Sequence, residues 1–226
     1  DHTVKTPDEI ENKGITVLSW IPKIEELKGG GKSEFIVLNK PKSPSSEAFR
    51  ALRTRLQYSK LEETPIKAIL LTSSVPSEGK TTISVNIAGS LAQTDKKVLI
   101  LDCDLRKPRI HNILENDRYP GLSDYLFSNA SLEDITRKTD LENLSFISSG
   151  TIPPNPSELL ASKQMKDFLL KMRSIYDYII IDSPPYISVT DAEILFRITD
   201  GTILVLKAGN TPADAFYRTC DKLSRL

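Results

Sequence analysis

The segment at residues 70–82 reads L-L-T-S-S-V-P-S-E-G-K-T-T and constrains the fold more than any other part of the chain. It predicts a buried strand, a tight loop after the strand, and a helix that begins where the loop ends. Such a loop presents successive backbone N–H groups, and the helix adds the partial positive charge of its N-terminus. The β- and γ-phosphates of a nucleotide suit this environment, with Lys80 as a flexible positive charge and the Thr81 hydroxyl as a ligand for Mg²⁺.

The segment matches only part of the phosphate-loop pattern G-x-x-x-x-G-K-[ST]. Ser74 stands where the pattern has its first glycine, while Gly79, Lys80 and Thr81 match its end. The alternative is that G-K-T-T occurs by chance at an ordinary helix start. The strand before the loop, together with acidic residues at the ends of two further strands, favours a nucleotide loop over that alternative.

Those acidic residues follow two apolar runs, V-L-I-L-D-C-D at residues 98–104 and Y-D-Y-I-I-I-D at residues 176–182. Asp182 has the position of a Walker B acid. Asp102 and Asp104 are two residues apart, so both would face one side of a continuing strand. One of them could then reach the metal shell and the other an incoming nucleophile. The alternative for D-C-D is a turn or helix cap after the strand.

The pattern of apolar runs predicts an α/β fold. Strands are expected at residues 66–73, 97–104, 144–148, 178–182 and 202–207, and helices at residues 47–59, 80–93, 157–176 and 213–226. Strands rich in Ile, Leu and Val without alternation are buried on both faces, as in a mostly parallel sheet flanked by helices. Ligands of such sheets bind outside the carboxyl ends of the strands, where the phosphate loop and the acidic residues would meet.

Residues 1–44 are expected to form an N-terminal arm, and residues 45–226 the main domain. Within the arm, residues 15–21 could form a strand that stops at Pro22, and residues 28–32 read as a flexible loop. Residues 41–46 read as a linker that ends in good helix N-cap residues.

The helix expected at residues 47–59 has two faces. Phe49, Leu52 and Leu56 fall on an apolar stripe, and Glu47, Arg50 and Arg53 fall on a charged one, in the pattern E-x-x-R-x-x-R. Taken alone, such a row is most often a solvated face stabilised by local ion pairs.

Composition excludes some functions and leaves others open. Thirty basic and thirty acidic residues cancel among the 226, so the overall charge gives no argument for a nucleic-acid partner. Two cysteines are too few for a disulfide framework, and two isolated histidines make no metal cluster. No apolar run is long enough to span a bilayer and no signal peptide opens the chain. Because the chain starts without Met and stops inside a helical pattern, we expect a fragment of a longer protein.

Three segments together resemble the bacterial tyrosine kinases (BY-kinases) of exopolysaccharide and capsule synthesis: residues 73–82, 98–109 and 176–185. The resemblance extends over essentially the whole chain, through residues 17–24, 120–126, 150–160 and 191–192. The wider relatives of this family are the deviant Walker ATPases that position division sites and segregate plasmids. Their loop carries an extra Lys at the position of Val75. The absence of this Lys from the chain favours the kinase branch. The resemblance implies a three-layer P-loop NTPase fold.

The resemblance also implies a role for each matching residue. Lys80 and the loop from Ser77, Glu78 and Gly79 through Thr81 to Thr82 would bind the phosphates of ATP. Thr81 and Asp104 would surround Mg²⁺, with Asp182 helping to fix that shell, and Asp102 would be the general base. Glu47, Arg50 and Arg53 match the family helix that packs subunits into a ring, an octamer by resemblance.

For the whole protein, the resemblance implies a tyrosine autokinase that transfers the γ-phosphate of ATP to tyrosines of a neighbouring subunit. It would be the cytoplasmic domain of a bacterial inner-membrane protein, with a transmembrane activator fused at its N-terminus and a cognate tyrosine phosphatase as partner. The C-terminal tyrosine cluster of the family is missing from this chain, and we expect it in the parent protein. Two other functions stay open: a P-loop ATPase assembly switch without tyrosine transfer, and a non-catalytic scaffold that sets polysaccharide chain length.

Overall fold

A six-stranded sheet forms the centre of the computed structural model, which describes residues 2–24, 27, 29–61 and 64–225. Its strands run in the order β5-β6-β4-β7-β3-β8. Five are parallel and one, at the edge, is antiparallel to its neighbour: β3 (Ala68–Ser73), β4 (Val98–Asp102), β6 (Leu144–Ile147), β7 (Tyr178–Asp182) and β8 (Gly201–Val205), with β5 (Thr136–Lys138) at the edge. The expected mostly parallel α/β fold is confirmed.

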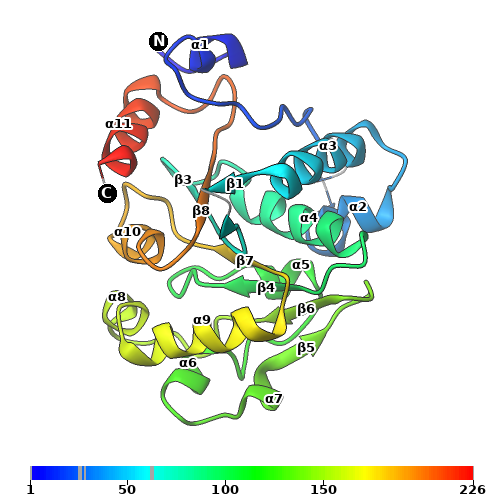
Figure 1. Cartoon of the computed structure of the whole chain (residues 1–226), viewed down its shortest axis with the longest axis vertical. Helices are drawn as coiled ribbons and strands as arrows, with labels where there is room; N and C mark the ends of the chain where they lie inside the picture. The colour runs from blue at the N-terminus through cyan, green and yellow to red at the C-terminus, as the bar shows by residue number, and fades with distance from the viewer. Residues whose placement is uncertain (1, 25–26, 28, 62–63, 226) are drawn as a thin grey trace.

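Helices cover both faces of this sheet, which gives three layers (Figure 1). One layer contains α2 (Ile36–Asn39), α3 (Pro44–Tyr58), α4 (Lys80–Ala92) and α5 (Ile110–Ile113). The other contains α6 (Leu122–Leu126), α7 (Leu132–Ile135), α8 (Pro156–Leu160), α9 (Lys163–Ile175) and α10 (Asp191–Phe196).

Successive residues of β3 illustrate how the sheet serves both layers. Ile69 and Leu71 pack in the core with α3 and α4, whereas Ala68 and Leu70 pack in the core with α6 and α9. All six residues of β3 are buried. The continuous apolar run therefore reflects a central strand with a core on each side.

The helix expected at residues 157–176 is two helices, α8 and α9, so that prediction was wrong in its continuity. The helical conformation is interrupted at Ser162, whose hydroxyl accepts a hydrogen bond from the backbone N–H of Met165. Ser162 thereby caps α9 and starts a new helix. Similarly, Ser43 caps α3 and Pro44 occupies its first turn, so α3 begins inside the segment expected to be a linker.

The strand expected at residues 15–21 does not form. The backbone carbonyls of Val17 and Leu18 instead accept hydrogen bonds from the guanidinium of Arg55 on α3, at 3.0 and 2.6 Å. These two carbonyl groups therefore bond to a side chain and not to the backbone of a partner strand. Of the loop expected at residues 28–32, residue 28 lies outside the described part of the chain, and Gly31 begins the short 3₁₀ helix η2 (Gly31–Glu34).

The arm lies against the main domain at two places. Near its start, before α1 (Pro7–Glu11), Thr3 forms a β-bridge with Pro212, just before α11 (Ala213–Ser224). Figure 1 shows α1 and α11 at the same end of the molecule. Further on, Phe35 and Val37 are buried in the core with α4. The arm therefore contributes to the core, and its separation from the main domain at residue 44 stays a prediction.

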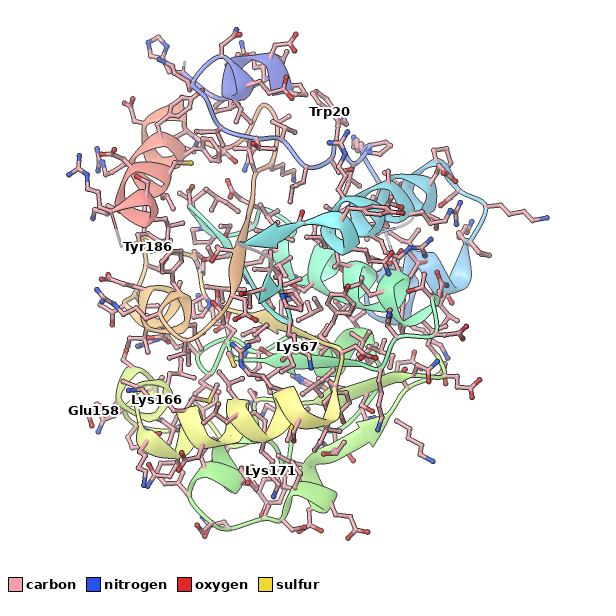
Figure 2. The ribbon with its side chains drawn as sticks, viewed as in Figure 1. Trp20, Lys67, Glu158, Lys166, Lys171 and Tyr186 are labelled. Carbon is pink, nitrogen blue, oxygen red and sulfur yellow. The ribbon has the colours of Figure 1, made fainter. Side chains whose placement is uncertain are left out.

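Two smaller features complete the fold. A short hairpin, β1 (Lys60–Leu61) with β2 (Thr64–Pro65), lies between α3 and β3. Trp20 on the arm is 53% exposed and lies at the surface (Figure 2). In the residues that the structure describes, none of the helices has the length and apolar character needed to cross a bilayer.

Candidate functional site

The register of the sheet brings the phosphate loop and the acidic residues to one edge. Asp102, the last residue of β4, lies directly opposite Asp182, the last residue of β7. Asp182 also lies opposite Leu71 of β3, two residues before that strand ends and the phosphate loop follows. Because these strands are parallel, their carboxyl ends open on the same side of the sheet.

The loop itself has the backbone conformation of a phosphate-binding nest. Ser77 and Gly79 both have positive φ, at 64° and 79°, and α4 begins at Lys80. A Cβ added to Gly79 would contact nothing within 4 Å, so the glycine is needed for its backbone angle rather than for space. Alternating conformations of this kind point consecutive N–H groups into one concavity that suits an anion.

Lys80, Thr81 and Asp182 form a buried cluster at the base of this loop. The ammonium of Lys80 lies 3.0 Å from Oδ1 of Asp182, and the hydroxyl of Thr81 donates to Oδ2 at 2.9 Å. Ser84 lies one helical turn after Lys80; its hydroxyl donates to the carbonyl oxygen of Lys80 at 2.8 Å and lies 3.3 Å from Oδ1 of Asp182. We did not predict this role for Ser84, although its position four residues after Lys80 on the same helix face could have indicated it.

Asp102 and Asp104 are close together, but for a different reason from the one expected. β4 ends at Asp102, so the two residues do not share one face of a continuing strand. The chain turns instead, and the backbone N–H of Asp104 donates to Oδ1 of Asp102 at 3.0 Å. The backbone N–H of Ile110 donates to Oδ2 of Asp102 at 3.2 Å. Asp104 in turn accepts backbone hydrogen bonds from Arg106 and Lys107.

The environment of Asp102 makes its carboxylate more basic than that of an exposed aspartate. Burial raises the pKa of this carboxyl well above its ordinary value, and the negative charges of Asp182 and Asp104 raise it further. The two backbone hydrogen bonds act in the opposite direction but do not cancel the effect. A carboxylate with a raised pKa is a stronger base, which suits proton abstraction.

The donor set at this edge fits a magnesium ion that completes its shell with phosphate oxygens and water. Thr81, Asp104 and Asp182 offer hard oxygen ligands, which Mg²⁺ prefers. Within the described residues, no group of three or more His, Cys, Asp or Glu side chains could hold a metal ion by itself. Mg²⁺ commonly uses only one or two protein carboxylates together with substrate phosphates, so the residues fit the ion.

The sequence placed Glu78 in the phosphate-binding loop but did not predict the surroundings of its side chain. Its side chain is buried, and Oε1 accepts a hydrogen bond from the hydroxyl of Thr211, in the segment after β8. Its Oε2 has no partner among the described residues. Burial raises the pKa of Glu78 to about 7, and the hydrogen bond from Thr211 offsets only part of that rise.

We expect Glu78→Gln to stabilise the protein more at high pH than at low pH. The folded chain keeps the proton of Glu78 up to about pH 7, whereas the unfolded chain loses it near the ordinary pKa of 4.5. Between these values the folded state binds more protons, so the stability of the wild type falls as pH rises through that window. The melting temperature of the variant minus that of the wild type should therefore increase from about pH 5 to about pH 8. A difference that stays constant over this range would show that Glu78 does not carry the raised pKa.

A second missed cluster holds the loop after β4. Arg106 forms two hydrogen bonds of 3.0 Å with the carboxylate of buried Asp191, at the start of α10, and a third with the hydroxyl of Ser157. Ser157 also donates to Asp191 at 2.6 Å. The resemblance included residues 98–109 and 191–192, yet nothing in the sequence indicated that Arg106 and Asp191 meet.

The charged row on α3 is less free than expected. Arg50 pairs with Glu47 at 2.7 Å on the surface. Arg53, in contrast, points to α4 and donates to the carbonyl oxygen of Ser90 at 3.0 Å, so the prediction that both arginines project outward was wrong for Arg53. Its guanidinium is partly buried between two helices of the same chain.

Comparison with known proteins gives consistent matches. The family model described as "AAA domain" matches residues 67–220. The tyrosine-protein kinase YwqD of Bacillus subtilis is 39% identical over 84% of this chain and 79% of its own length. The tyrosine-protein kinase wzc of Salmonella typhimurium is 33% identical over 90% of this chain, which spans only 30% of that relative.

Solved structures agree with these matches. The kinase domain of the Escherichia coli tyrosine kinase ETK superposes with a TM-score of 0.91 at 32% identity, over 98% of this chain and 90% of that one. The septum site-determining protein MinD of Pyrococcus horikoshii, solved with Mg-ADP, superposes with a TM-score of 0.60 at 24% identity, over 70% of this chain and 65% of that one. At that identity the likeness to MinD shows a shared P-loop fold.

Proposed function

The chain belongs to the bacterial P-loop tyrosine kinases, the BY-kinases, and we propose that it transfers the γ-phosphate of ATP to tyrosines of a neighbouring copy. The observation that carries this proposal is the gathering of Lys80, Thr81, Asp102, Asp104 and Asp182 at one sheet edge. A scaffold would have no need for all five.

In this proposal the loop binds the nucleotide. The backbone N–H groups from Ser77 to Thr82 receive the phosphates, and Lys80 exchanges its partner Asp182 for them. Thr81, Asp104 and Asp182 would hold Mg²⁺, and the ion would supply positive charge that neutralises the phosphate oxygens. When Lys80 turns to the phosphates, the carboxylate of Asp182 would become available as a ligand for the ion.

Asp102 acts as the general base. It accepts the proton of the tyrosine hydroxyl while the tyrosine oxygen forms a bond to the γ-phosphorus and the bond between that phosphorus and the β–γ bridging oxygen breaks. ADP and phosphotyrosine result, with the proton on Asp102. Two backbone N–H groups, from Asp104 and Ile110, hold this carboxylate in place. Phosphoryl transfer depends mainly on such positioning and on charge stabilisation.

The direct test is the formation of phosphotyrosine. The chain is incubated with Mg·ATP and a tyrosine-containing peptide, and products are identified by mass spectrometry. We expect phosphate on the tyrosine and release of ADP. Release of ADP and inorganic phosphate without phosphotyrosine would support an ATPase assembly switch, and no turnover of ATP would support a non-catalytic scaffold.

We further propose that the domain works in a membrane-anchored assembly that regulates exopolysaccharide or capsule synthesis. The proposed parts are a homo-oligomeric ring, an octamer by family resemblance, an activator segment fused to the arm, and a cognate tyrosine phosphatase. The names of relatives support this context, since they include a Staphylococcus aureus kinase called CapB and a Ralstonia solanacearum kinase called EpsB. The inner membrane is the proposed location.

Assembly through α3 predicts different effects for its two arginines. Arg50→Ala should shift the assembled kinase toward monomer, because the guanidinium of Arg50 can exchange its partner within the chain, the exposed Glu47, for a carboxylate of another subunit. Arg53→Ala should instead lower the melting temperature, since it removes the contact with Ser90 on α4. Light scattering at several protein and salt concentrations measures the first effect.

The matched control is Arg197→Ala, which removes a similar surface ion pair, with Glu193, from α10. It should leave the mass unchanged. Equal masses for Arg50→Ala and wild type at every concentration would mean that the charged row is a solvated face.

A further inference from the structure

One buried carboxylate, Glu34, lies outside every nucleotide motif yet contacts the site from the arm. It is the last residue of η2 and is only 6% exposed. Burying a carboxylate costs free energy unless it is paired and hydrogen-bonded. Phe35 and Val37 already bury the neighbouring stretch of the arm in the core with α4, so packing alone does not require a charged residue here.

The first partner of Glu34 lies in the phosphate-loop helix. The hydroxyl of Thr82 donates to Oε1 of Glu34 at 2.9 Å. Thr82 directly follows Thr81, and both lie in the first turn of α4. The side-chain amide of Asn86, one turn later, donates to the backbone carbonyl of Glu34 at 2.8 Å. The side chain and backbone of one arm residue are thus attached to the start of α4.

The second partner lies in the loop after β4. The guanidinium of Arg109 approaches Oε2 and Oε1 of Glu34 at 3.3 and 3.4 Å. Arg109 directly precedes Ile110, whose backbone N–H donates to Asp102. Arg109 is about half exposed, and its contacts with Glu34 are at the long end of the hydrogen-bond range.

We propose that Glu34 is a positioning residue for phosphate transfer, joining the first turn of the phosphate-loop helix to the loop that holds Asp102. Through Thr82 and Arg109 it sets the distance between the bound γ-phosphate and the base. It does not touch the reacting atoms. This inference rests on the function proposed above and adds to it an arm residue that acts on the rate of the chemical step.

The test measures single-turnover consumption of Mg·ATP, with and without a tyrosine peptide, together with equilibrium ATP binding. Glu34→Gln keeps an acceptor for Thr82 but loses the charge that attracts Arg109. We expect the rate constant to fall roughly tenfold to a hundredfold while ATP affinity is unchanged, since a small displacement near the chemistry has effects of this size. Thr82→Val, which removes the other link, should act in the same direction.

A double-variant cycle separates positioning from a merely structural role. Arg109→Gln should slow turnover about as much as Glu34→Gln, and the two together should cause little further loss, because both break one link. Additive losses, or a Glu34→Gln chain that turns over at the wild-type rate, would overturn the proposal. So would a fall in melting temperature without a fall in the rate constant of the folded protein.

The control is Lys32→Gln, in the same 3₁₀ helix. Lys32 forms a surface ion pair with Asp140 at 3.1 Å and contacts neither Thr82 nor Arg109. This variant should turn over ATP at the wild-type rate; a loss equal to that of Glu34→Gln would contradict a specific role for Glu34. If wild type consumes ATP without forming phosphotyrosine, the proposed function fails while the Glu34 test still stands. A wild-type chain that consumes no ATP overturns both.

Discussion

Lys80→Met is expected to abolish the binding and turnover of Mg·ATP. The variant removes the positive charge that the phosphate loop directs at the β- and γ-phosphates, and methionine cannot replace it. Isothermal calorimetry with Mg·ATP measures the binding. Wild-type affinity in this variant would contradict the assignment of the site.

Stability should also fall, because Lys80 is not a free surface residue. It is buried and paired with buried Asp182, and breaking a buried ion pair typically costs about 3–5 kcal/mol. The hydroxyl of Thr81 still donates to Asp182, so we expect the lower end of this range. This cost means that lost binding alone would not separate a missing charge from a disturbed fold.

The double variant Lys80→Met with Asp182→Asn is the matched control. The amide that replaces the Asp182 carboxylate carries no charge, so the desolvation penalty of an unpaired carboxylate disappears and the melting temperature should recover. ATP binding is compared with that of Asp182→Asn alone, because Asp182 is also a proposed Mg²⁺ ligand. The double variant should bind ATP more weakly than this single variant, since the phosphate-directed charge is still missing. A recovered melting temperature with binding equal to that of Asp182→Asn would mean that Lys80 acts only by neutralising Asp182.

The edge of the sheet that carries the site was predictable from the sequence. Unbroken runs of Ile, Leu and Val before Asp102 and Asp182 indicate central parallel strands, and the carboxyl ends of such strands meet at one edge. This rule brings Lys80 and both acids together without any knowledge of their contacts. The paired register of Asp102 and Asp182 confirms it.

The links that hold the site were not predictable in the same way. Glu78 with Thr211, and Glu34 with Thr82 and Arg109, join residues that are far apart in the chain. These contacts depend on how loops fold over the sheet edge. The spacing of apolar residues along the sequence does not predict how loops fold, so only the structure shows these partners.

The predicted end of β4 was wrong because a single hydrogen bond decides where this strand stops. β4 was expected to continue to residue 104, yet the N–H of Asp104 turns back to the carboxylate of Asp102. Asp residues readily bond to backbone groups two positions on and so compete with strand pairing. The same sequence, D-C-D, therefore supports a turn as well as a strand, which was the alternative considered.

Asp102→Asn should keep Mg·ATP binding but lose most transfer to tyrosine. The amide has nearly the size of the carboxylate and cannot accept the tyrosine proton. General-base catalysis contributes about 10²–10⁴-fold, so a loss of that size is expected in the rate of phosphotyrosine formation. Rapid-quench kinetics with a tyrosine peptide measures the loss, and calorimetry measures the retained binding.

The comparison with Asp104→Asn decides between the two acids. If Asp104 is the metal ligand, its variant should lose Mg²⁺-dependent nucleotide affinity first; the reverse pattern would mean that their roles are exchanged. The melting temperature of Asp102→Asn is measured as well, because the amide has one acceptor oxygen and its NH2 group would face one of the two backbone N–H groups that hold the carboxylate. Burial and the charges of Asp182 and Asp104 raise the pKa of Asp102 in the folded state. A group whose pKa is raised by folding costs stability as pH rises, so the melting temperature of the neutral variant minus that of the wild type should increase with pH. A variant that is more stable than wild type and yet inactive would show that Asp102 is kept for proton transfer at the expense of stability.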